Sequence, residues 1–343
     1  KRQDTLFYFT TCGWMMWNWM VSGLAVGATV VLFDGNPFYP TVNVLWQLVD
    51  DVGISVFGTS AKYLSASEKF GAIPRKTHQL STLRAILSTG STLTEANFEY
   101  VYRDIKSDLM LSSISGGTDI VSCFVLGNPI LPVIKGEIQC RGLGMDVHAI
   151  DPKGQSIQDK KGELVCQTAF PSMPVYFWND ATGERYKSAY FDSYPNQWRH
   201  GDYITINRNG GVVIWGRSDA TLNPGGVRIG TSEIYRVVEK CPDVIDSVVV
   251  GKTLPNDERV VLFVKMKEKR VLTPDLKKQL RNQIKEDCTP RHVPSTIIAV
   301  ADIPYTMSGK KVELAVKCII NGQAVPNKES IQNPESLRYF KTE

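Results

Sequence analysis

The sequence predicts an α/β protein made of three successive units. Residues 1–130 alternate hydrophobic strands with amphipathic helices, which is typical of a largely parallel sheet. Residues 131–218 contain short strands separated by glycine and proline, which favours a small antiparallel barrel or sheet. Residues 219–343 mix helices and strands like a compact α+β unit. A chain of 343 residues is long enough for two or three such units.

In the first unit, hydrophobic runs define the strands and helical spacing defines the helices between them. We expect strands at 28–33, 54–58, 83–88 and 109–111, and helices at 43–52, 61–70 and 94–105. Because strands and helices alternate, the strands should lie parallel, and ligands should bind beyond their carboxyl ends.

A nearly apolar stretch over residues 14–33 has almost the length of a membrane span. Gly23 and Gly27 divide it into an aromatic-rich half and a β-branched run, and Asp34 and Gly35 end it. This division favours a buried helix that leads into a central strand over a membrane helix. Asp4 follows the charged start, so no cleavable signal is expected.

The later units show shorter elements. In the second unit we expect strands at 136–139, 162–166 and 211–215. In the third unit we expect helices at 232–240 and 274–286 and strands at 247–251, 260–265 and 295–300.

Composition excludes several classes of function. The net charge of +4 is spread along the chain without a basic block, so nucleic acid is not an expected partner. The seven cysteines form no Cys-x-x-Cys pair, which argues against a disulfide framework or a thiolate zinc site and indicates a reducing, cytosolic compartment. The four histidines are scattered and lack metal-ligand spacing.

Two loops after predicted strands are candidates for phosphate contacts. The Ser115-Gly116-Gly117-Thr118-Asp119 segment could turn backbone N–H groups, a hydroxyl and a carboxylate toward an anion and its metal ion. Alone, such a segment is more often a plain turn. Gly90 and Ser91 begin a second loop, where a helix cap by Ser91 or Thr92 is an equal alternative. No P-loop is present, because Asp246 and Pro304 stand where its first glycine is needed.

Three further segments carry isolated charges beside glycine. Asp202 follows Gly201 and offers a carboxylate suited to a diol. Arg217 and Arg228 bracket the glycine pair 225–226 and can neutralise phosphates. Lys310 follows Ser-Gly and can present one ammonium group to two anions. Each charge alone would be an ordinary surface residue, but their combination favours a functional site.

These segments resemble the adenylate-forming acyl-CoA synthetase superfamily. Within it, the strings over 7–35, 115–119 and 221–234 most resemble acetoacetyl-CoA synthetases, and the resemblance covers nearly the whole chain. It implies that 1–130 is a partial α/β subdomain of a large adenylating domain and that 131–218 is a β-rich, barrel-like subdomain. Residues 219–343 would form a mobile C-terminal α+β domain with its hinge at Asp219.

The resemblance also implies which residues bind the nucleotide. The implied ATP- and AMP-binding residues are Gly90, Ser91, Gly117, Thr118, Asp202, Arg217 and Arg228. Thr118 would contact the α-phosphate, and Asp202 would bind the ribose hydroxyls. Asp119 would hold Mg²⁺ at a position where the family usually has glutamate.

Other implied roles concern the acyl group and CoA. Lys310 would bridge the substrate carboxylate and the α-phosphate; Lys311 is the same residue type, but the family's lysine directly follows Ser-Gly. Gly225 and Gly226 would line the CoA channel. Gly116 and Gly117 would widen the acyl pocket beyond that of acetate-activating relatives.

The implied reaction converts acetoacetate, ATP and CoA to acetoacetyl-CoA, AMP and pyrophosphate, with Mg²⁺ as cofactor. The family's glycine-rich phosphate loop should precede Thr29 and is not in the sequence, so a fragment or alternative product of a larger enzyme is expected. Two alternatives therefore stay open, namely a silent nucleotide- or CoA-binding fragment and a ligase for another short-chain acid.

Overall fold

The computed structural model describes residues 1–218, 220, 222, 224, 229–254, 257–306, 309–325 and 328–341. It divides the chain into two units. The N-terminal unit comprises Lys1–His200 and Ile204–Ile214, and the C-terminal unit comprises Gly201–Tyr203 and the chain from Trp215 onward. The three-part division expected from the sequence stays a prediction.

A five-stranded parallel sheet forms the first half of the N-terminal unit, as the alternation of strands and helices predicted. Its order is β2-β1-β3-β4-β5, with every neighbouring pair parallel. The strands are β1 (Thr5–Tyr8), β2 (Thr29–Val31), β3 (Val56–Ser60), β4 (Ala85–Thr89) and β5 (Met110–Ser113). The strand order reverses at β1 and β3, which is the kind of switch point where open α/β sheets bind ligands.

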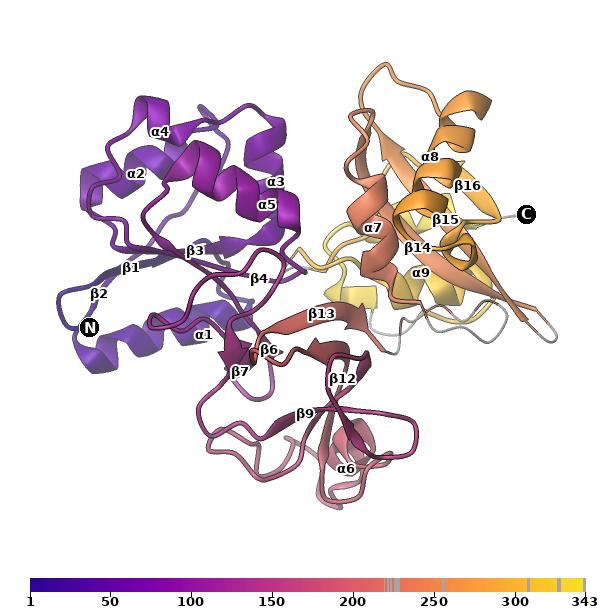
Figure 1. The fold of residues 1–343 in the computed structure, drawn as a ribbon, viewed down its shortest axis with the longest axis horizontal. Coiled ribbons are helices and arrows are strands. Elements are labelled where there is room, and N and C mark those ends of the chain that lie inside the picture. The colour runs from indigo at the N-terminus through magenta and orange to yellow at the C-terminus, as the bar shows by residue number, and fades with distance from the viewer. Residues whose placement is uncertain are drawn as a thin grey trace. The chain divides into compact units, whose positions relative to one another are not determined.

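Helices cover both faces of this sheet (Figure 1). They are α1 (Met15–Ser22), the 3₁₀ turn η1 (Gly23–Val26), α2 (Val44–Val52), α3 (Ala61–Lys69), α4 (Pro74–Thr77), α5 (Glu95–Tyr100) and the π-helical turn η2 (Val101–Ile105). Strand β1 shows how the faces divide: Phe7 packs in the core with α2, α3 and α5, whereas Leu6 and Tyr8 pack with α1. The alternation is that of a strand buried on both sides.

The apolar stretch 14–33 folds as α1, η1 and β2, as expected for a buried helix that leads into a strand. Gly27 ends η1 with φ +75°, a conformation that few other residues adopt. Among the described residues, the structure contains no helix with both the length and the apolar character that a membrane crossing needs.

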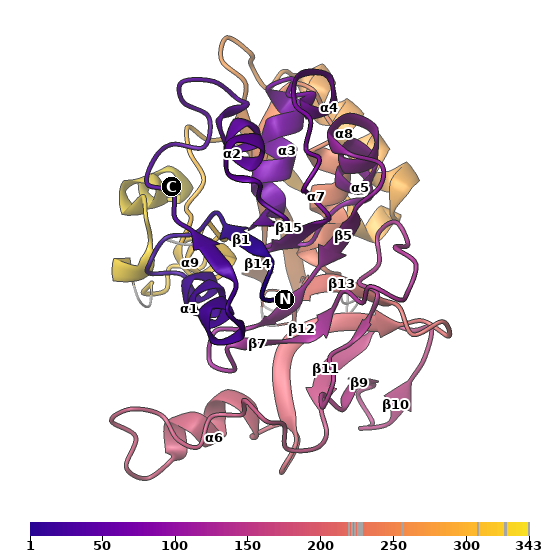
Figure 2. The same cartoon turned by 90° about the vertical axis from the view of Figure 1, so that its left-hand side faces the viewer.

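The second half of this unit forms two open sheets in place of the expected barrel. One has the order β6-β7-β8 and the other β10-β9-β11-β12-β13, and the described strands close no barrel. The strands are β6 (Ser115–Gly117), β7 (Ser122–Leu126), β8 (Cys140–Arg141), β9 (Val147–Ile150), β10 (Ser156–Ile157), β11 (Gly162–Cys166), β12 (Trp198–Ile206) and β13 (Val212–Arg217). Figure 2 shows β9, β10 and β11 side by side. The predicted strand at 136–139 is wrong, because only Ile138 pairs there, in an isolated bridge to Val212.

The C-terminal unit is a three-stranded sheet covered on both faces. Strands β14 (Val244–Leu254) and β15 (Asp257–Met266) pair antiparallel, and β16 (Thr296–Ala299) adds parallel to β15. Val249 packs with α7 (Thr231–Val238) and α8 (Pro274–Asp287) on one face. Val248 and Val250 pack on the other face with α9 (Glu313–Ile320) and the 3₁₀ segment η6 (Pro334–Phe340).

The seven cysteines are all unbridged, as their spacing predicted. Cys12 is exposed, whereas Cys166 and Cys318 are buried. Burial raises the pKa of the Cys123 thiol to about 11 and also raises the pKa of Cys166 and Cys288. Cys123, Cys166 and Cys288 therefore have little thiolate character at neutral pH.

Candidate nucleotide and acyl site

Two of the predicted loops lie side by side at the carboxyl ends of neighbouring strands. Gly90 and Ser91 directly follow β4, and residues 114–119 follow β5. The Thr89 hydroxyl at the end of β4 donates a hydrogen bond of 2.9 Å to the carbonyl of Ile114. Because β4 and β5 are parallel neighbours, their following loops meet at the sheet edge where ligands of this fold class bind.

The loop after β4 is shaped by Gly90 and leaves Ser91 outside the helix cap. Gly90 has φ +90°, and a side chain on it would stand 3.5 Å from the Trp14 ring. Helix α5 is capped by Thr94, whose hydroxyl accepts a hydrogen bond from the Asn97 backbone at 3.4 Å. A cap by Ser91 or Thr92, the alternative reading of this loop, is therefore wrong. Ser91 is exposed.

The segment with two glycines is a β-hairpin and not the open loop that the sequence suggested. Gly116 and Gly117 lie in β6, which pairs antiparallel with β7. A Cβ on Gly116 would lie 2.0 Å from the carbonyl oxygen of Ser122, so only glycine fits. A Cβ on Gly117 would lie 2.8 Å from Cε1 of His200. Both glycines let neighbouring atoms of Ser122 and His200 approach the backbone closely. Their N–H groups lie in the paired strands β6 and β7 and not in an open loop.

Thr118 and Asp119 occupy the exposed turn of this hairpin. Asp119 accepts a hydrogen bond from the Tyr190 hydroxyl, and the Tyr190 ring stacks on Trp198 with centroids 3.5 Å apart. Trp198 is 2 % exposed and fixed in the core. Its stacking on Tyr190 therefore fixes the position of the Asp119 carboxylate. Tyr190 carried no signal in the sequence, because it comes from α6 (Glu184–Tyr190), a helix that we did not predict.

The Asp119 carboxylate suits a magnesium ion shared with substrate phosphates. The described residues contain no cluster of three acidic, histidine or cysteine side chains that could hold a metal by themselves. Mg²⁺ in nucleotide sites commonly takes one or two carboxylates together with phosphate oxygens and water. One exposed carboxylate beside Thr118 is consistent with that arrangement.

His200 supports the hairpin from the neighbouring sheet. Its Nδ1 accepts a hydrogen bond from the Trp198 indole at 3.5 Å, and its Nε2 lies 3.2 Å from the Gly116 carbonyl. These partners assign a neutral ring with the proton on Nε2. The Phe124 ring meets the imidazole edge-on at 4.8 Å. Sequence reasoning treated His200 as an ordinary histidine, although its place between Arg199 and Gly201 could have marked it.

Asp202 and Arg217 form an ion pair in the C-terminal unit. Their Oδ1 and Nη1 atoms are 3.6 Å apart, with Asp202 8 % exposed and Arg217 half-exposed. Gly201 has φ +82°, and a side chain on it would lie 2.9 Å from the Arg217 guanidinium. Glycine at this position therefore allows the arginine to pack directly on the backbone.

Lys310 joins this pair electrostatically from a segment far along the chain. It lies on a tight turn in which the Thr306 N–H donates to the Lys310 carbonyl at 2.8 Å and the Lys310 N–H donates to the Thr306 hydroxyl at 3.0 Å. The surrounding protein lowers the pKa of its ammonium group; Asp202 opposes this shift, and Arg217 adds to it. Three charged residues predicted from separate segments therefore influence one another.

The structure separates Lys310 from its neighbour Lys311. Lys310 is exposed, whereas the Lys311 side chain is 20 % exposed and contacts Glu239 and Asp246. The ammonium groups of the two lysines therefore have different partners. Four predicted positions, the hinge Asp219, the CoA-channel residues Gly225 and Gly226, and the phosphate-binding Arg228, lie outside the described residues.

Part of the chain matches a known protein-family model. A family model described as the AMP-binding enzyme C-terminal domain matches residues 233–310. Curated relatives match 98% of the chain at identities of 52% and 56%. The chain is therefore similar to AMP-binding enzymes along nearly all of its length, as the motifs indicated.

Within that family the chain is similar to proteins named for acetoacetate. It is 56% identical over 337 residues to acetoacetyl-coenzyme A synthetase of Rhizobium meliloti and 52% identical over 340 residues to acetoacetyl-CoA synthetase of Mus musculus. The solved acetoacetyl-CoA synthetase from Streptomyces lividans superposes on 99% of the chain with a TM-score of 0.92 at 41% identity. The chain covers 52%, 51% and 52% of these three proteins, and thus spans about half their length.

Proposed function

We propose that this chain forms part of an ATP-dependent acid–thiol ligase that activates acetoacetate and transfers it to CoA. The products are acetoacetyl-CoA, AMP and pyrophosphate. The observation that carries the proposal is identity of 50–56% along 98% of the chain to relatives named acetoacetyl-CoA synthetase. ATP, Mg²⁺ and CoA are the corresponding cofactor and co-substrates.

In the first step, an acetoacetate carboxylate oxygen attacks the α-phosphorus of ATP, and pyrophosphate leaves with the electrons of the broken bond. Both reactants are negative, so the site must neutralise charge and align them. The ammonium group of Lys310 suits the space between carboxylate and α-phosphate, and Thr118, on an exposed turn, suits the phosphate. Bound Mg²⁺ would be held at Asp119 and would supply further charge neutralisation.

The nucleotide and the acyl group are assigned to different segments of the chain. The Asp202 carboxylate suits the ribose hydroxyls, with Arg217 beside it at 3.6 Å for ribose or phosphate. Gly90 and Ser91, at the sheet edge after β4, suit the nucleotide. Gly116 and Gly117 stay assigned to the acyl pocket, where His200 is the side chain that faces Gly117.

In the second step, the CoA thiol attacks the acyl carbon, the bond to AMP breaks, and the thiol proton passes to solvent. We assign Gly225 and Gly226 to the pantetheine channel and Asp219 to the hinge of a rotation that removes Lys310 after adenylation. Arg228 is assigned to the phosphates. A cytosolic location also stays a prediction, supported by seven unbridged cysteines.

Isotope exchange between pyrophosphate and ATP tests the proposal. The natural gene product should catalyse exchange that depends on acetoacetate, and added CoA should release AMP. Lys310→Ala should abolish the exchange, whereas Lys317→Ala, which removes a lysine paired with Glu258 in the same unit, should not.

The other outcomes separate the alternatives. Exchange with a different short acid and none with acetoacetate would identify that acid as the substrate in place of acetoacetate. No exchange with any acid, together with retained ATP or CoA binding, would favour a silent binding protein.

A further inference from the structure

The turn that carries Lys310 is fixed to the C-terminal unit through the residue that follows it. Tyr305 and Lys311 pair in an antiparallel bridge, so the two residues close the base of the turn. Gly309 has φ +77° and donates its N–H to the Thr306 carbonyl at 2.8 Å. Lys310 is the exposed residue among the described positions of this turn, and its place therefore depends on how the base of the turn is held.

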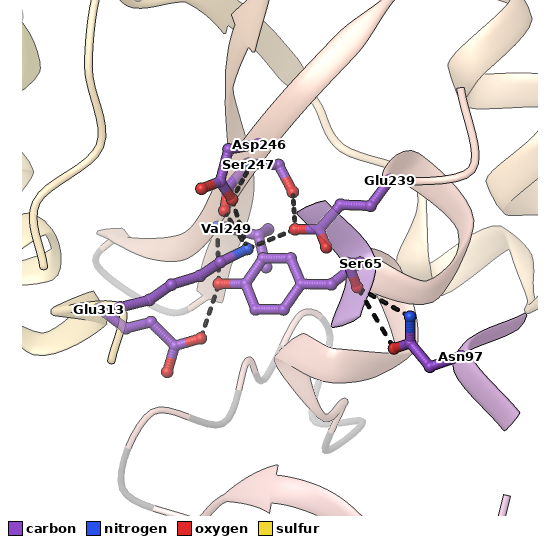
Figure 3. Close-up of polar contacts among 9 residues, drawn as sticks. Ser65, Asn97, Glu239, Asp246, Ser247, Val249 and Glu313 are labelled. Carbon is purple, nitrogen blue, oxygen red and sulfur yellow. Dashed lines mark hydrogen bonds and ion pairs between the residues drawn. The ribbon is translucent and has the colours of Figure 1, made fainter. Parts of the chain in front are cut away.

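The Lys311 ammonium group is saturated by three acceptors (Figure 3). It contacts Glu239 at the end of α7, Asp246 Oδ1 at 3.0 Å and the Ser247 carbonyl at 2.6 Å. A lysine has three N–H donors, so this set leaves none unused. The ammonium group also lies 3.9 Å from the centroid of the Tyr235 ring, a cation–π contact.

The residues around this lysine are themselves fixed. The Tyr235 hydroxyl donates to Glu313 at 2.6 Å and accepts from the Val249 backbone at 3.1 Å. The Ser247 hydroxyl donates to Glu239 at 3.2 Å. Residues of helix α7, strand β14 and the start of α9 therefore fix the surroundings of the Lys311 side chain. We call Lys311 with Glu239, Asp246 and Tyr235 the lysine anchor.

The charges of the lysine anchor favour the pairing of Lys311 with its two carboxylates. Burial alone would lower the pKa of Lys311, but Glu239 and Asp246 outweigh it and hold the pKa above its usual value. Burial and the Glu313 carboxylate raise the pKa of Tyr235, so the phenol stays neutral. Lys311 is consequently charged and paired at any pH where the enzyme would work.

The opposite side of the turn is fixed by a second set of contacts. The Tyr305 N–H donates to the Asn333 side chain at 2.9 Å, and Asn333 donates to Asp302 at 2.7 Å. Asp302 is paired in turn with Lys265 of β15 at 2.8 Å. Both strands that lead into the turn are therefore tied to the central sheet.

We propose that Lys311 is a positioning residue that fixes the place of Lys310 for the adenylation step. Adjacent Cα atoms are about 3.8 Å apart, so holding the Lys311 side chain against Asp246 and Ser247 of β14 restricts where the Lys310 backbone can lie. The ordering is built into the fold and does not have to be supplied by substrate binding. This inference rests on the proposed function and names a second lysine, one that never touches substrate.

Two half-reactions of the natural gene product test the proposal. Lys311→Met should lower acetoacetate-dependent exchange on the order of 100-fold, because small displacements of a catalytic group have effects of that size. Thioester formation from supplied acetoacetyl-adenylate should change less than about threefold, because Lys310 serves only adenylation. A merely structural lysine would lower both half-reactions together.

Further variants guard against misfolding. Lys311→Met leaves two carboxylates close together, so Glu239→Gln, which keeps the lysine and its contacts with Asp246 and Ser247, serves as a milder variant. It should lower the exchange in the same direction by a smaller factor. Lys317→Met removes a lysine paired with Glu258 at 3.4 Å elsewhere in this unit and should leave both half-reactions within about twofold of the unchanged protein.

A readout independent of activity is amine labelling followed by mass spectrometry. Acetic anhydride should modify Lys310 and spare Lys311, and Glu239→Gln should raise the labelling of Lys311. Equal labelling of the two lysines, or equal losses in both half-reactions, would overturn the positioning role alone. No exchange in the unchanged protein would overturn the proposed function, and this inference with it.

Discussion

Lys310 is the residue on which the proposed adenylation depends, and its environment makes that step sensitive to pH. The surrounding protein and Arg217 lower the pKa of its ammonium group below the usual 10.5, while Asp202 acts in the opposite direction. A lysine with a lowered pKa loses its charge at a lower pH. Since the charged form is the useful one, adenylation should fall as pH rises, with a midpoint below 10.5.

Substitutions beside Lys310 should move this midpoint in opposite directions. Arg217→Met removes a positive neighbour and should raise it, whereas Asp202→Asn removes a negative neighbour and should lower it. Exchange rates measured across alkaline pH give the midpoints whatever happens to the maximal rate. Shifts of the same sign in both variants would contradict the arrangement.

The two adjacent lysines show what the sequence could and could not predict at this scale. The Ser-Gly-Lys pattern identified Lys310 as the candidate, and its exposure agrees. Nothing local indicates that Lys311 is paired, because its partners Glu239 and Asp246 lie more than 60 positions earlier in the sequence. His200 and Tyr190 escaped notice for the same reason, since their roles come from packing across strands.

Single elements are fixed at their ends, and the starts of three parallel strands give a clear case. Asp4 precedes β1, Ser55 precedes β3 and Arg84 precedes β4. Asp4 accepts from the Arg84 guanidinium at 2.7 Å and from the Ser55 hydroxyl at 3.2 Å. Burial alone would raise the pKa of Asp4, but Arg84 and the N-terminal ammonium group at Lys1 lower it to about 2.

This depressed pKa predicts acid sensitivity. Asp4 stabilises the fold above its usual pKa of 3.8, and the contribution is lost as pH falls toward 2. Arg84→Met should therefore cost about 1–2 kcal/mol at neutral pH, and the cost should shrink near pH 2, as urea unfolding of the two proteins would show. Arg208→Met, which removes an exposed pair with Asp159, should cost less than about 0.5 kcal/mol. An equal cost for both variants would contradict this account.

The β6–β7 hairpin depends on Gly116. Gly116→Ala would place a methyl group 2.0 Å from the Ser122 carbonyl, so the strands must separate. We expect a loss of about 1–3 kcal/mol in the free energy of unfolding. Gly13→Ala is the matched control, because the nearest atom there is 3.9 Å away, and denaturant midpoints measure both variants. A midpoint for Gly116→Ala as high as that of the control would exclude the close approach.

For the whole molecule, the sequence predicted the parallel pairing of the first sheet better than it predicted whether the second region closes into a barrel. Parallel pairing follows from the alternation of strand and helix, because each crossover helix must return the chain to the same edge. No comparable rule applies to the short strands over 131–218. Their spacing indicates hairpins, but it does not indicate whether the last strand pairs with the first to close a barrel. Of the two predicted alternatives, a barrel or a sheet, the described strands form open sheets.

The proposed two-step cycle also makes a prediction at this scale. Gly226→Leu would fill the assigned pantetheine channel, so thioester formation should stop while acetoacetate-dependent exchange persists. Measuring exchange and CoA-dependent AMP release on the same sample provides the internal control. A normal overall rate would remove Gly226 from the channel.

The exposure pattern of the seven cysteines has a practical consequence. Cys12 is exposed, and burial suppresses the thiolate form of Cys123, Cys166 and Cys288. A maleimide fluorophore at neutral pH should attach first at Cys12, without any engineered residue. The dye would sit between β1 and α1, and its emission would report melting of the five-stranded sheet in a protein otherwise left intact.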